Sequence, residues 1–122
     1  MNAYDELIEK LEEGEHIEGI VFGPFGWGSP PRSETEPWEL GYDEPRNIPV
    51  PFNKRGVVLN IDEARPMMDG WSFYTGYGAP ECYAVYIWTN KRIFWVTQYD
   101  GATGLCSAPR HPIDTMPDMP GG

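Results

Sequence analysis

The side chains best suited to nucleophilic or metal chemistry in this chain are two cysteines and two histidines: Cys82, Cys106, His16 and His111. A nucleophile needs a base held beside it, and neither histidine lies in a recognisable motif. Cys106 and His111 are close in sequence, but that alone does not make a catalytic pair. A zinc site would require all four side chains to converge, and their spacing matches no familiar zinc pattern. The sequence therefore predicts a protein that is not an enzyme and that uses no metal and no cofactor.

Binding of a nucleotide or another small ligand would use aromatic and basic residues of the C-terminal half. Trp71 and Tyr77 could line an apolar pocket, and Arg92 and Arg110 could supply charge for a phosphate. The glycine-rich stretch 76–81 lacks the spacing of a phosphate loop. The same rings would equally suit a hydrophobic core, so ligand binding is an alternative function here.

Charge is distributed unevenly along the chain, whose net charge is −10. Residues 1–46 hold 12 acidic and 3 basic residues, a balance of −9, whereas residues 47–122 hold 7 acidic and 6 basic residues, a balance of −1. An acidic surface repels nucleic acid and anionic membranes and attracts basic surfaces. We therefore expect a basic protein as the partner, with neither nucleic acid nor membrane bound directly. The candidate contact residues are carboxylates and two tryptophans of the acidic segments: Glu9, Glu12, Glu13, Glu34, Glu36, Glu39, Asp43, Glu44, Trp27 and Trp38.

The clearest structural signal is a set of three strands, predicted over 82–88, 93–99 and 102–108. Aromatic and β-branched residues fill the first two strands. Asn90 favours a turn between them, and the pair Asp100-Gly101 is typical of a hairpin turn. Side chains alternate between the faces of a strand, and neither face of the first two strands is polar. We therefore expect an antiparallel meander whose first two strands are covered on both faces.

Upstream of the meander, the apolar spacing over 3–13 predicts a helix with Asn2 as its N-cap. A strand is predicted over 15–22. Asn60 and Glu63 have the form of a capping box, which predicts a short helix over 61–69 that Pro66 would kink or end.

The segment 23–56 is too rich in proline and glycine for a regular element. Its five aromatic residues indicate an ordered loop, from which the carboxylates would project outward. The tail 111–122 is predicted to be frayed or to lie extended across the body, with Met116 and Met119 as anchors. Together the sequence predicts one α+β domain over 1–122, with a mostly antiparallel sheet: helix and strand over 1–22, the acidic aromatic loop over 23–56, a short helix and the meander over 57–110, and the tail.

Two short patterns resemble known families. The segment YAVYIWTNKRIFWVTQYDGATGLCSAP resembles the strand pair of bacterial pleckstrin-homology-like or GRAM domains, with Thr89 to Arg92 at the hairpin, and residues 11–15 resemble their L-x-x-G-E lead-in. Residues 23–80 have no counterpart in those domains. The C-terminal half, ending in PDMPGG, is similar to small proteins of phages and prophages whose function is unknown. That resemblance implies a bacterial cytoplasm and a role against host defences, and it assigns no catalytic residue.

The leading hypothesis is therefore a non-enzymatic, phage-type accessory protein that binds, and inhibits, a basic host defence protein. Its acidic surface would mimic nucleic acid, as in an anti-CRISPR protein. The alternatives are the small-ligand binder and a structural component of a phage particle. No secretory signal or membrane span is recognisable in the sequence, so a cytoplasmic location with reduced cysteines is expected.

Overall fold

Four antiparallel strands form the sheet around which the domain is built, in the spatial order β1-β2-β3-β4. The computed structural model describes residues 1–73, 80–99 and 102–117. The strands are β1 (Ile17–Phe25), β2 (Tyr83–Thr89), β3 (Arg92–Tyr99) and β4 (Ala102–Pro109). The predicted meander and the predicted α+β class are thus confirmed, whereas the predicted turn at 100–101 lies outside the described residues.

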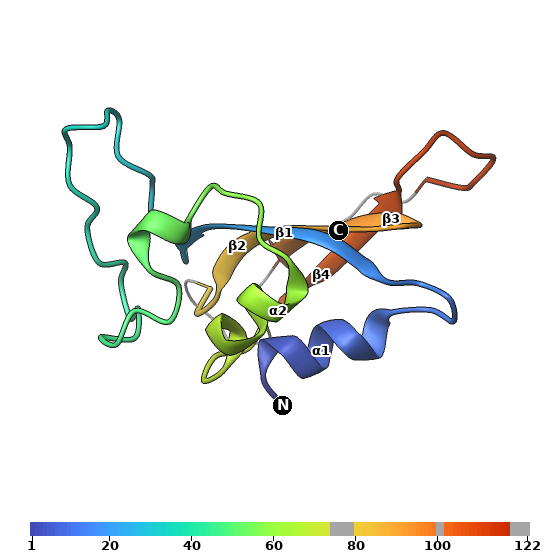
Figure 1. Ribbon diagram of the computed structural model, residues 1–122, viewed down its shortest axis with the longest axis horizontal. Helices are drawn as coiled ribbons and strands as arrows, with labels where there is room; N and C mark the ends of the chain where they lie inside the picture. The colour runs from blue at the N-terminus through green and yellow to red at the C-terminus, as the bar shows by residue number, and fades with distance from the viewer. Residues whose placement is uncertain (74–79, 100–101, 118–122) are drawn as a thin grey trace.

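Two short helices, α1 (Ala3–Lys10) and α2 (Ile61–Ala64), lie on the same side of this sheet (Figure 1). Two 3₁₀ turns accompany them, η1 (Phe52–Lys54) and η2 (Arg65–Met68). Among the described residues no helix has the length and apolar character needed to cross a membrane.

The ends of both helices follow local signals in the sequence. Asn2 accepts a hydrogen bond from the backbone N–H of Asp5 at 2.9 Å, which is the expected N-cap. The helix ends earlier than predicted, because Leu11 is already extended. The capping box of α2 is present, since Asn60 and Glu63 exchange both of its hydrogen bonds. Only one α-helical turn follows before η2 begins, where Pro66 cannot supply a backbone N–H.

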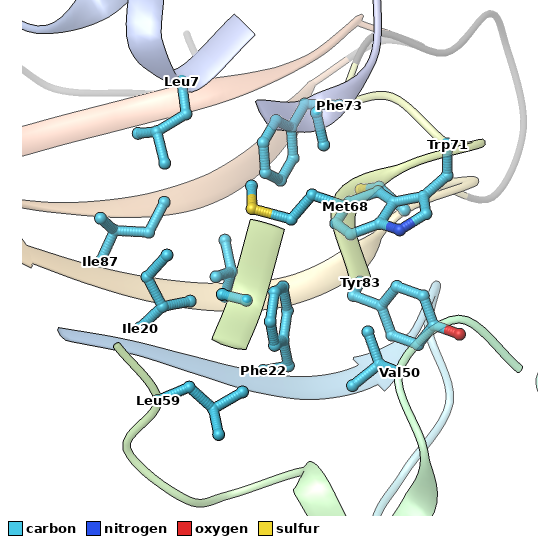
Figure 2. Packing of buried hydrophobic residues seen from close by; sticks show 14 of the residues in the cluster. Leu7, Ile20, Phe22, Val50, Leu59, Met68, Trp71, Phe73, Tyr83 and Ile87 are labelled. Atoms are coloured by element: carbon cyan, nitrogen blue, oxygen red, sulfur yellow. The ribbon is translucent and has the colours of Figure 1, made fainter. Parts of the chain in front are cut away.

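The hydrophobic core lies between the helices and one face of the sheet (Figure 2). Ile20 and Phe22 of β1 and Tyr83 and Ile87 of β2 contribute fully buried side chains to it. From the other layer come residues of α1, η2 and the segments beside them, which are Leu7, Val50, Leu59, Met68, Trp71 and Phe73.

The opposite face of the sheet is not covered in the described part of the chain, which contradicts the prediction that both faces would be. Buried and exposed residues alternate along β2, and Tyr86 is 55% exposed. Tyr86 pairs across the sheet with Trp95, which is half-buried, and Trp88 pairs with Ile93. The reason lies in the long loop, which leaves the end of β1 and hangs beyond the end of the sheet (Figure 1). We call this side of the sheet the outer face.

The tail after β4 also differs from the prediction. Residues 111–117 contain no helix or strand and are exposed. Met116 is 85% exposed and therefore anchors nothing, and Met119 lies outside the described residues.

Because the core lies on one face of the sheet, truncating residues on the two faces should cost different amounts of stability. Truncating Phe22 to alanine should destabilise the domain by about 3–5 kcal/mol, because it leaves a cavity in the core. Tyr86→Ala on the outer face should cost less than about 1 kcal/mol, since only cross-strand contacts are lost. Urea unfolding of both variants measures the difference. Similar losses would mean that the outer face is buried in solution.

Candidate functional site

The long loop is fastened to the sheet by a buried ion pair between Glu44 and Arg55. Both side chains are almost completely shielded from solvent. One oxygen of Glu44 accepts hydrogen bonds from the Arg55 guanidinium and, at 2.8 Å, from the hydroxyl of Tyr83 on β2. The other oxygen accepts from the backbone N–H of Gly41 at 2.9 Å. Arg55 also donates to the carbonyl of Val50 at 3.2 Å. The pair therefore joins the middle of the loop, its end and the sheet.

Aromatic rings surround the same guanidinium. Its central carbon lies 4.9, 4.6 and 5.1 Å from the ring centroids of Trp38, Phe52 and Tyr83. Contacts of this kind are favourable cation–π interactions. Trp38 also stacks on Phe52, with 5.7 Å between the centroids. Burial and the hydrogen bond to Glu44 raise the pKa of Tyr83, so its hydroxyl stays a proton donor.

Glu44 is thus not the outward-facing contact residue that the sequence predicts. A guanidinium shielded from water needs a carboxylate next to it, because an unpaired buried charge is very costly. Glu44 meets that need and is 5% exposed. Trp38 is half-buried because one part of its ring packs against Arg55 and Phe52.

Two neighbouring hollows lie at this loop, and the second of them reaches the outer face of the sheet. The first, which we call the loop hollow, has a volume of about 610 Å³ and is lined by Trp27, Trp38, Tyr42, Glu36 and Glu39 among others. The second, the sheet groove, has a volume of about 540 Å³ and is lined among others by Val21, Gly23, Pro30, Trp38, Tyr86 and Trp95. Pro24, Pro30, Trp38 and Arg55 line both, so the two hollows are neighbours.

The loop end of the molecule keeps its exposed charges. Glu34, Glu36, Glu39 and Asp43 are exposed, and so is Trp27, with 72% of its surface accessible. Glu36 is held in place by the backbone N–H of Arg32 at 3.1 Å. This end therefore presents the carboxylates and the tryptophan that the sequence assigns to partner binding.

Glu9, Glu12 and Glu13 lie elsewhere, because α1 and the turn after it reach the opposite end of the long axis (Figure 1). At that end Glu15 binds Arg92 at 2.6 Å, and Glu18 binds Arg110. Glu12 lies 4.0 Å from both Lys91 and Arg92.

The charges of that end nearly cancel, since Glu9, Glu12, Glu13, Glu15 and Glu18 give −5 and Lys10, Lys91, Arg92 and Arg110 give +4, a balance of −1. The two acidic segments therefore do not form one surface. Charges that neutralise each other locally cannot steer a distant basic partner.

The residues of the alternative ligand site are not brought together. Trp71 is buried in the core, where its indole N–H donates to the carbonyl of Met67 at 2.7 Å. Arg92 and Arg110 lie beside Thr89, the last residue of β2, and each is bound to a glutamate of the chain. Tyr77 lies outside the described residues.

The candidate nucleophiles and metal ligands are also dispersed. Cys82 and Cys106 are free thiols. Burial raises the pKa of Cys82 to about 12, which keeps it protonated and unreactive. Within the described ranges no three residues among histidine, cysteine, aspartate and glutamate form a group that could hold a metal ion.

Comparison with protein-family models, with curated proteins and with solved structures finds no match to this chain. Sequence reasoning identified Trp27, Trp38 and the loop carboxylates but missed Tyr86 and Trp95. The signal that could have found them is the apolar character of both faces of the strands, which is as consistent with an exposed binding face as with a second core layer.

The ion pair can be tested by removing one partner. Glu44→Ala should destabilise the domain by about 3–5 kcal/mol, because it leaves Arg55 buried without a counter-charge. Glu39→Ala, on the same loop but exposed, should change stability by less than about 0.5 kcal/mol. Combining Glu44→Gln with Arg55→Met should recover part of the loss, since no charge is then buried. Equal urea midpoints for the two single variants would show that the pair does not hold the loop.

The ion pair between Glu15 and Arg92, at the end of the molecule opposite the loop, should stabilise the fold less at acid pH. The hydrogen-bonded Arg92 guanidinium is the main reason that the pKa of Glu15 is lowered from 4.5 to about 2. Because the pKa is lower in the folded protein, this ion pair stabilises fully above about pH 4.5, and its contribution is lost as the pH falls towards 2. Glu15→Gln should therefore flatten the fall in melting temperature across that range. Glu9→Gln, on the exposed side of α1, should leave the curve unchanged, and parallel curves for all three proteins would contradict this assignment.

Proposed function

We propose that this protein is a non-enzymatic binding domain that recognises a basic partner protein through the loop hollow and the adjoining sheet groove. Support comes first from the Glu44–Arg55 pair, which fixes a loop with several exposed carboxylates in one place beside an apolar, aromatic groove. Large exposed apolar patches rimmed by polar residues commonly mark interaction sites. The buried centre of such an interface is typically aromatic, with charged residues at its rim.

Each part of the surface has its own role in this mechanism. Glu34, Glu36, Glu39 and Asp43 would attract a basic surface and speed the encounter. Trp27 would then become buried at the contact, since tryptophan is the side chain that most often contributes strongly to interface affinity. The host setting proposed from the sequence fits this scheme, because a nucleic-acid-binding protein exposes the lysines and arginines that such a rim attracts.

Neither alternative function gains a comparable observation. The residues of the small-ligand site are not brought together, since Trp71 is in the core and Arg92 and Arg110 are each bound by a glutamate. A role in a phage particle would use the same surface towards an assembly protein and predicts that the chain copurifies with virions.

Charge reversal at the loop tests the proposed function. A tagged protein carrying Glu34→Lys, Glu36→Lys and Glu39→Lys should capture its partner from a bacterial lysate about tenfold less well than the unchanged protein. Capture by the unchanged protein should fall when salt rises from about 50 mM to about 500 mM. Quantitative mass spectrometry of the eluates measures both effects.

The matched control carries Glu9→Lys, Asp62→Lys and Asp114→Lys, which change the net charge by the same amount at exposed positions away from the loop. It should capture the partner as well as the unchanged protein does. Equal losses in both triple variants would mean that only the overall charge matters, and no loss in either would remove the loop from the interface.

A further inference from the structure

The sheet groove has walls of aromatic and proline side chains and a shallow floor. Tyr86 and Trp95 stand on the sheet side, and Trp38 and Pro30 come from the loop. A Cβ added to Gly23 would meet the Cβ of Ala84 at 3.2 Å, so these two residues pack closely and leave no room for a larger side chain at Gly23. Exposed flat rings in an open groove suit an extended chain better than a compact ligand.

Among the described side chains that line the groove, only the hydroxyl of Tyr86 could accept a hydrogen bond from what binds there. Arg55 is the one charged residue among the described residues that line it, and Arg55 is already bound by Glu44 and Val50. A peptide N–H buried there without a partner would cost about 1–3 kcal/mol. Proline has no N–H to satisfy, and its polyproline II conformation is formed before binding and packs on aromatic rings. The groove therefore selects for proline.

The neighbouring loop hollow adds a preference for positive charge at one end of such a segment. Glu36 and Glu39 line this hollow, together with the exposed rings of Trp27 and Tyr42. Arg32 also lines it, so its exposed groups carry a net charge of −1, since the buried Glu44–Arg55 pair cancels. Carboxylates next to accessible rings are suited to a guanidinium, which can form ion pairs and stack on a ring.

From these features we infer that the groove and the loop hollow together bind an extended proline-rich segment of the partner protein, with an arginine placed in the loop hollow. This inference rests on the proposed function and adds the chemistry of the bound segment. The prolines would lie over Tyr86 and Trp95, and the arginine would face Glu39 and Trp27.

Synthetic peptides test the chemistry directly. The probe is the acetylated and amidated peptide Arg-Ala-Leu-Pro-Pro-Leu-Pro, titrated into the full chain while tryptophan fluorescence is recorded, because Trp38 and Trp95 line the groove. Saturable binding is expected, and it should weaken about tenfold when alanine replaces the prolines or glutamine replaces the arginine. No saturable change up to about 1 mM peptide, or equal binding of all three peptides, would overturn the inference.

Variants of the protein locate the binding. Tyr86→Ser should weaken binding of the arginine peptide about tenfold, whereas Tyr86→Phe, which keeps the ring, should not. Ile113→Ser removes an apolar residue of similar exposure outside the groove and should have no effect. Glu39→Gln should weaken binding of the arginine peptide and leave binding of the glutamine peptide unchanged. Unaltered binding to Tyr86→Ser would place the peptide elsewhere and overturn the inference.

Two other results have defined meanings. A dimer in light scattering that dissociates in Tyr86→Ser would make the groove a contact between two copies of this chain, which also overturns the inference. Failure of every peptide, while the loop reversal still weakens partner capture, would refute the proline-rich segment alone and leave the proposed function standing. Peptide binding together with unchanged capture by the loop-reversed protein would refute the proposed function instead.

Discussion

The position of the long loop depends on one buried carboxylate, that of Glu44. It binds a guanidinium of the loop's own end, a tyrosine hydroxyl of β2 and a backbone N–H of the loop itself. A buried ion pair is seldom a net source of stability compared with apolar residues of the same volume, because both charges lose their water. Its effect here is to specify one arrangement, since a loop placed differently would leave Arg55 buried without its counter-charge. The aromatic rings around Arg55 strengthen that selection, because they contact the same group.

The two faces of the sheet differ as a consequence. The inner face is covered by α1, η2 and the segments beside them, whose apolar residues are joined to the sheet in one cluster. The loop could have covered the outer face as a second layer. It is instead fastened to Tyr83, the first residue of β2, and so extends beyond the sheet. The rings of Tyr86 and Trp95 therefore stay accessible, and the loop forms a side wall next to them. A groove arises at this boundary because the covering layer stops there.

Sequence patterns predicted the elements whose causes are local. The turn around Asn90, the N-cap Asn2 and the capping box at Asn60 act within a few positions, and the structure contains them nearly where they were expected. The errors concern partners that are distant in the chain. Glu15 meets Arg92 across 77 positions, and the burial of Glu44 depends on Tyr83, 39 positions away. No spacing rule connects such residues, so a carboxylate in a pairing network looks the same in sequence as a solvated one.

The charge asymmetry of the sequence consequently does not carry over into space. Most of the negative balance falls in the first 46 residues, but the folded chain places those residues at two ends and pairs Glu15 and Glu18 of one end with arginines. The carboxylates that stay unpaired around the loop hollow are few, and surface charges of this kind influence association rate more than affinity. In the proposed function, affinity would then come mainly from apolar contact with the rings of the groove.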